Sequence, residues 1–124
     1  MSLARRILVL VPLTVAAAAT AHAAIAPSAL KVTYWPHGRG AAASVWTLRC
    51  DPTGGTHPRR RLACAALGRH AADLRPATRA CTLMPTLTSA QARITGTWGG
   101  RRVNRTYRFG CPGWEDLRVV LTGR

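Results

Sequence analysis

Residues 92–109, ARITGTWGGRRVNRTYRF, contain two runs of alternating apolar and polar side chains, separated by Gly99-Gly100. Alternation with a period of two is typical of a strand that has one buried face. Two adjacent glycines accept the positive φ angles that a tight two-residue turn requires. The stretch therefore predicts a β-hairpin with strands over 92–100 and 101–109.

Outside this hairpin, the sequence predicts further strands, a helix and a long loop. The predicted strands cover 28–35, 42–50 and 116–123, the loop covers 51–61, and the helix covers 62–74. The helix is indicated by the spacing of Leu62, Ala66 and Leu67, and Pro76 stops it. The loop is dense in Gly, Pro, Thr and Asp, which favour turns. An antiparallel sheet with a helix predicts an α+β domain.

The N-terminal segment has the layout of a secretory signal peptide. Arg5 and Arg6 precede an apolar stretch, and the small-residue pattern Ala21-His22-Ala23 follows it. A transmembrane anchor fits less well, because the apolar stretch is short and rich in alanine. We therefore predict that residues 1–23 are removed after export and that 24–124 form one secreted domain. No second long apolar run follows, so no membrane span is expected.

Four cysteines remain after this cleavage: Cys50, Cys64, Cys81 and Cys111. An even number of cysteines in a short exported chain indicates two disulfides, for which three connectivities are possible. A structural metal site is not expected, because the chain has no Cys-x-x-Cys pair and its four histidines are scattered. No motif indicates a cofactor.

The chain is strongly basic, with 18 Lys and Arg residues against four Asp and Glu, a net charge of +14. Removal of Arg5 and Arg6 with the signal peptide lowers this charge by two. The arginine excess has two explanations, a GC-rich genome or attraction to an acidic partner. No nucleic-acid-binding motif accompanies the arginines and aromatic residues are few, so no nucleic acid is expected as a partner.

Few residues in the sequence could support catalysis. His57 lies near Asp51 and Thr56 in the turn-rich loop, and His70 lies on the predicted helix. Neither histidine belongs to a nucleophile motif, and four carboxylates leave little for acid–base chemistry. A loop histidine more often stabilises a turn or lies in solvent, so we do not expect an enzyme.

Three motifs follow one another along the chain: APSAL near the mature start, GTHP (55–58) followed by Ala63-Cys64, and G-x-W-x-G-x-R-V from Gly96 to Val103. Together they resemble the Streptomyces subtilisin inhibitor family. The resemblance extends from about Ala26 to Leu121. It implies a secreted, homodimeric inhibitor of serine proteases, built from a five-stranded antiparallel sheet packed with one or two helices. It also implies disulfides joining Cys50 to Cys64 and Cys81 to Cys111.

The same resemblance implies the position of a reactive loop. The residue two after the third cysteine is P1 in this family, so Leu83 would fill the protease's specificity pocket and Leu83–Met84 would be the scissile bond. Cys81 would be P3 and Thr82 would be P2. An apolar P1 suits subtilisin-like and chymotrypsin-like pockets, whereas trypsin binds a cation.

The loop departs from the family pattern after Met84. Family loops usually have an aromatic residue at P2′ and a proline later, whereas this loop has Pro85 at P2′ followed by Thr86. Counted from Trp98 instead of Cys81, the loop is about two residues longer and P1 would move to Pro85. We use the count from Cys81, because the disulfide anchors that side. The alternative function is a non-inhibitory, cationic secreted binding protein that retains the inhibitor scaffold.

Overall fold

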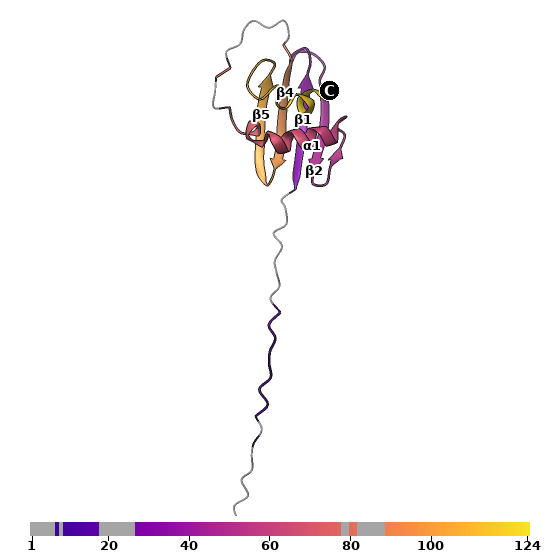
Figure 1. Cartoon of the computed structure of the whole chain (residues 1–124). Helices are drawn as coiled ribbons and strands as arrows, with labels where there is room; N and C mark the ends of the chain where they lie inside the picture. The colour runs from indigo at the N-terminus through magenta and orange to yellow at the C-terminus, as the bar shows by residue number, and fades with distance from the viewer. Residues whose placement is uncertain (1–6, 8, 18–26, 78–79, 82–88) are drawn as a thin grey trace, which may run out of the picture.

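The computed structural model describes residues 7, 9–17, 27–77, 80–81 and 89–124. Its strands and helices follow one another in a single domain (Figure 1). They are β1 (Ser28–Trp35), β2 (Ser44–Cys50), β3 (Gly54–Gly55), α1 (Arg60–Arg69), the 3-10 helix η1 (Ala71–Leu74), β4 (Gln91–Trp98), β5 (Arg101–Arg108) and α2 (Arg118–Thr122).

The strands form one antiparallel sheet in the order β3-β2-β1-β4-β5. Val32 of β1 lies opposite Trp46 on one side and Ile94 on the other. The predicted hairpin is confirmed, since β4 and β5 pair across the turn at Gly99-Gly100. The predicted α+β class with five antiparallel strands is also confirmed.

Both helices cover the same face of the sheet, where the core lies (Figure 1). Alternate strand residues such as Leu30, Val32 and Ile94 are buried beneath Leu67 of α1 and Leu121 of α2. No described helix packs on the other face of the sheet. The domain therefore has two layers, with one sheet face left open.

The predicted strand over 116–123 is wrong, because this segment contains helix α2. Val120 and Leu121 are buried against the sheet and α1. A short apolar run such as Val119–Leu121 does not by itself distinguish a strand from a helix. The helix ends at Gly123, whose φ of 70° is a left-handed conformation that favours glycine.

The fifth strand is β3, which lies inside the segment predicted as a loop. Gly54 and Gly55 pair with Arg49 and Leu48 at the edge of the sheet. A Cβ on Gly55 would lie 2.3 Å from the carbonyl oxygen of Thr47, so this approach requires glycine. Two glycines carry no alternation signal, which explains why the strand was missed.

The predicted helix over 62–74 is divided in two. α1 begins two residues earlier, at Arg60, and ends at Arg69, and η1 completes the segment after His70. Pro76 follows both helices, as predicted.

Both disulfides have the pairing that the resemblance implies. Cys50 is joined to Cys64, with 5.7 Å between their Cα atoms, and this bond fastens α1 to β2. Cys81 is joined to Cys111, with a Cα–Cα distance of 5.1 Å.

In the described part of the chain, no helix has the length and hydrophobicity needed to cross a membrane. The predicted signal peptide lies partly outside the described residues, and its described residues, 7 and 9–17, belong to no helix or strand.

Candidate functional site

The described chain on both sides of residues 82–88 is fastened to one end of the β4–β5 hairpin. On the N-terminal side, the disulfide ties Cys81 to Cys111, three residues beyond the end of β5. On the C-terminal side, the carbonyl of Ala90 accepts a hydrogen bond of 3.1 Å from the amide of Phe109. The open end of the hairpin therefore anchors both flanks of the predicted reactive loop.

Most of the predicted site residues lie outside the described residues. These are Thr82, Leu83, Met84, Pro85 and Thr86. Cys81, the predicted P3 residue, is described and half-buried. The structure therefore defines the base of the predicted loop, and the P1 assignment stays a prediction.

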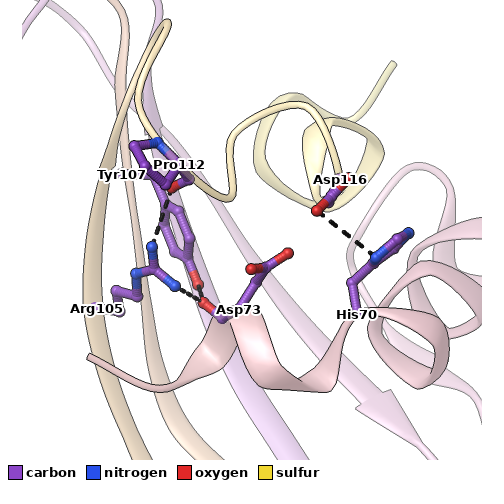
Figure 2. A network of polar contacts seen from close by, with 6 residues as sticks. All are labelled: His70, Asp73, Arg105, Tyr107, Pro112 and Asp116. Atoms are coloured by element: carbon purple, nitrogen blue, oxygen red, sulfur yellow. Dashed lines mark hydrogen bonds and ion pairs between the residues drawn. The ribbon is translucent and has the colours of Figure 1, made fainter. Parts of the chain in front are cut away.

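The segment that leads toward Cys81 is held by a side chain of β5 (Figure 2). The guanidinium of Arg105 donates hydrogen bonds to the carbonyl oxygens of Asp73 and Arg75, the latter at 3.0 Å. The hydroxyl of Tyr107 also donates to the carbonyl of Asp73, at 2.6 Å. These bonds connect the chain just after η1 to the sheet.

The same guanidinium holds the segment that carries Cys111. Arg105 donates a 3.0 Å hydrogen bond to the carbonyl of Pro112, and its guanidinium carbon lies 4.6 Å from the centre of the Tyr107 ring. One side chain thus joins the two segments that the Cys81–Cys111 disulfide also joins (Figure 2). We call the set of Asp73, Arg75, Arg105, Tyr107 and Pro112 the loop clamp.

Tyr107 is the buried member of the loop clamp. Its ring is 1% exposed, and burial raises the pKa of its hydroxyl well above the usual value, with the charge of Arg105 opposing this shift. The hydroxyl is therefore protonated at all physiological pH values and available to donate to Asp73.

A tight turn places Cys111 against the core. The amide of Cys111 donates to the carbonyl of Arg108, and the amide of Trp114 donates to the carbonyl of Cys111. Trp114 is 2% exposed and lies edge-on to Phe109, with ring centres 5.8 Å apart. Gly113 has a φ of 88°, and a Cβ there would lie 3.2 Å from both Arg105 and Tyr107. The turn is therefore built around the loop clamp.

A second polar cluster lies between the two helices. Nδ1 of His70 is 3.7 Å from Oδ2 of Asp116, an ion pair when the imidazole is protonated (Figure 2). Burial and the neighbouring Asp116 carboxylate raise the pKa of Asp73, against the opposing charges of Arg105 and His70. The three side chains bring possible metal ligand atoms within 4.8 Å of one another, but they are partly or fully exposed. Sequence reasoning did not bring these residues together, since Asp116 lies far from the other two in the chain.

His57, considered as a catalytic candidate, stabilises a turn. It is 2% exposed, Nδ1 accepts a 3.0 Å hydrogen bond from the amide of Arg59, and Nε2 donates to the carbonyl of Val120 at 2.9 Å. Burial lowers its pKa, against the opposing effect of the Val120 hydrogen bond. Both ring nitrogens are engaged with the backbone, so this histidine is neutral and structural.

Sequence reasoning also missed the loop clamp. Arg105 and Tyr107 follow Val103 at alternate positions of β5, so all three face the helices. A cation on the core-facing side of a strand is uncommon. The core-facing position of Arg105 was therefore the one sequence signal for the loop clamp. Its three acceptors are backbone carbonyls, which the sequence does not identify.

In sequence, this chain is similar to known protease inhibitors. A family model described as subtilisin inhibitor-like matches residues 26–111. Protease inhibitor SIL-V2 from Streptomyces orinoci is 42% identical over 96 residues, which cover 70% of this chain and 85% of that protein. Among solved structures, Streptomyces caespitosus sermetstatin in complex with Bacillus licheniformis subtilisin matches with 26% identity and a TM-score of 0.46, over 68% of this chain and 84% of that chain.

Proposed function

The chain belongs to the subtilisin inhibitor-like family, and on this premise we propose that it inhibits subtilisin-like or chymotrypsin-like serine proteases through a substrate-like loop. In this proposal Leu83 is P1, and Leu83–Met84 is the scissile bond. The family model and the relative describe inhibitors and not enzymes, in agreement with the expectation that this chain is not an enzyme.

The observation that carries the proposal is the double anchoring of the chain around residues 82–88. An inhibitor must present an extended segment to the protease and resist release after cleavage. Fixed ends keep the cleaved bond in register, and a segment ordered before binding loses less conformational freedom in the complex. The Cys81–Cys111 disulfide and the loop clamp fix the P side in this way.

The chemistry of the proposed P1 residue supports the target class. A leucine has no charge to match the carboxylate of a trypsin-like pocket, but it fills an apolar pocket. Burial of its side chain would contribute about 1.5–3 kcal/mol to the complex.

The P′ side supports the proposal less directly. Pro85 stands where the family usually has an aromatic residue, and Thr86 follows it with a spacing that differs from the family's. We expect this difference to change which protease is inhibited rather than to abolish inhibition. The second candidate, a non-inhibitory cationic secreted binding protein, is favoured by the altered P′ side and by the charge of the mature chain, which is the +14 of the full sequence less the two charges of Arg5 and Arg6.

Secretion and assembly into a homodimer are part of the same proposal. Mass spectrometry of protein exported from a bacterial host should show a mature chain beginning at Ala24 or Ile25. Sedimentation equilibrium should show the homodimer that the family resemblance implies.

Inhibition assays on Leu83 variants test the central claim. Leu83→Gly should weaken inhibition of subtilisin about tenfold or more, since each decade corresponds to about 1.4 kcal/mol, and should leave the unfolding midpoint unchanged. Leu83→Lys should shift the preference toward trypsin. Leu62→Ala changes an exposed leucine of α1, far from the proposed loop in sequence, and serves as the matched control. Inhibition by the unmodified protein that is insensitive to both Leu83 changes would refute the P1 assignment, and no inhibition of any serine protease would favour the cationic binding protein.

A further inference from the structure

One imidazole and two carboxylates meet where the helical segments approach each other (Figure 2). His70 lies between α1 and η1, Asp73 belongs to η1, and Asp116 lies two residues before α2 begins. One ligand atom from each side chain lies within 4.8 Å of the other two. No other three His, Cys, Asp or Glu side chains in the described part of the chain meet so closely. We call these three residues the helix-end cluster.

The backbone directs the three side chains toward one another. Asp73 follows His70 by three residues, and its amide donates a 2.9 Å hydrogen bond to the carbonyl of His70. Side chains at this spacing lie on the same side of a 3-10 turn. The carbonyl of Asp73 belongs to the loop clamp, which fastens it to β5. Asp116 lies in a turn in which the amide of Arg118 donates to the carbonyl of Glu115, so both sides of the cluster are held by hydrogen bonds.

The carboxylates of the helix-end cluster have no arginine or lysine bound to them. The chain has 18 Lys and Arg residues and four Asp and Glu, so cations are available for every carboxylate. Among the described residues, however, the ion pair that forms joins Asp116 to His70, and no arginine or lysine takes part in one. Arg105 acts on Asp73 through its charge, but its guanidinium donates its hydrogen bonds to backbone carbonyls. Two neighbouring negative charges therefore remain for another cation.

The ligand types indicate which cation fits. Zn²⁺ binds histidine nitrogen and aspartate oxygen, and three protein ligands with one water satisfy it. Ca²⁺ takes about six to eight oxygen ligands, and Mg²⁺ requires near-octahedral oxygen coordination, so both fit a nitrogen-containing set of three poorly. Two carboxylates also balance the charge of a divalent ion.

The distances require only a small adjustment to hold zinc. Tetrahedral ligands at about 2.0 Å from the metal lie about 3.3 Å apart. Nδ1 of His70 lies 3.7 Å from Oδ2 of Asp116, and every pair of ligand atoms in the cluster lies within 4.8 Å. Side-chain rotation must therefore close these distances by about 1.5 Å or less. The side chains of His70 and Asp116 are 36% and 54% exposed, so they have room to rotate.

We propose that the helix-end cluster binds one Zn²⁺ ion through Nδ1 of His70 and one carboxylate oxygen each of Asp73 and Asp116, with water as the fourth ligand. The ion joins η1 to the segment before α2, and it therefore acts beside the loop clamp as a structural link. Zinc binding does not depend on the proposed inhibition, because the reactive loop contributes no ligand.

Titration of the full chain, with both disulfides intact, with zinc chloride in a calorimeter tests the proposal. His70→Gln, Asp73→Asn and Asp116→Asn each remove one ligand while keeping a side chain of similar size. Glu115→Gln is the matched control, because it removes an exposed carboxylate next to Asp116 that lies outside the cluster. His37→Gln is a second control, which removes an exposed histidine elsewhere. Circular dichroism checks that all five variants fold.

The unmodified protein should bind one zinc ion per chain. Each ligand variant should bind zinc about tenfold or more weakly, since loss of even an outer-shell partner weakens metal binding about tenfold to a hundredfold. Both controls should retain the affinity. Zinc should also raise the thermal unfolding midpoint of the unmodified and control proteins more than that of the ligand variants, because an ion that binds only the folded chain stabilises it.

Three results would overturn the proposal. The first is a lack of zinc binding by the unmodified protein, and the second is equal zinc affinity in the ligand variants and the controls. The third is one zinc ion for two chains, which would place the ion between copies of the chain instead of within the helix-end cluster. Tighter binding of Ca²⁺ than of Zn²⁺ would overturn the assignment to zinc.

Discussion

Replacement of Arg105 by methionine should lower the free energy of unfolding by about 2–3 kcal/mol, a large part of the stability of a small domain. Methionine keeps an apolar stem against Tyr107 but removes every donor. Of the three carbonyls that Arg105 contacts, that of Asp73 retains the Tyr107 hydroxyl, and that of Arg75 is exposed to water. The half-buried carbonyl of Pro112 loses its charged donor, and such a bond is worth about 1.5–3 kcal/mol.

Urea unfolding at pH 7 with both disulfides intact, followed by tryptophan fluorescence, measures this loss. Arg101→Met is the matched control, because Arg101 lies exposed at the other end of β5. It should change the free energy of unfolding by less than about 0.5 kcal/mol. An Arg105→Met protein as stable as the Arg101→Met protein would show that the loop clamp does not hold the two segments together.

Three further changes test other parts of the structure. Burial lowers the pKa of His57 in the folded protein, so as the pH falls the unfolded chain binds a proton on this histidine before the folded chain does. The free energy of unfolding should therefore be level above about pH 6.5 and decline below it. His57→Gln should remove that decline in unfolding curves measured between about pH 5 and 7. Gly55→Ala should destabilise the folded protein by about 1–3 kcal/mol, because its Cβ would overlap the Thr47 carbonyl. Gly68→Ala lies in open space on α1 and should stabilise the folded protein by about 0.5–1 kcal/mol. Thermal unfolding of the two variants measures both changes. The double variant Cys81→Ala and Cys111→Ala should lose about 3–4 kcal/mol of stability, and a loss below 1 kcal/mol would show that this link does not restrict the unfolded chain.

The sequence predicted the parts of the fold whose side chains repeat with a regular period. Residues 28–35 and 101–108 alternate because one face of each strand is buried, so their bounds were predicted almost correctly. β3 carries no side chains and therefore no period, and α2 buries Val120 and Leu121 in a run too short to distinguish a helix from a strand. In both cases the conformation is set by packing against distant residues.

The site was predicted only as far as the family resemblance extends. The resemblance supplied the Cys81–Cys111 pairing, which the residues alone left among three possibilities, and it supplied the position of Leu83. It did not supply Arg105, whose partners are backbone carbonyls of Asp73 and Pro112. Any residue offers such an acceptor, so only the folded chain shows which ones meet the guanidinium.

The side chains of β5 alternate between the two faces of the sheet, and Arg105 points toward the helices, where it holds the base of the proposed reactive loop. Arg105→Met should therefore speed cleavage of the Leu83–Met84 bond by subtilisin, because a base that is held less firmly lets the cleaved ends separate.

Mass spectrometry of the protein incubated with subtilisin measures the lifetime of the intact inhibitor. Arg101→Met, which changes an exposed arginine at the other end of β5, should leave this lifetime unchanged. If Arg105→Met and Arg101→Met gave the same lifetime as the unmodified protein, the loop clamp would hold the two segments without contributing to inhibition.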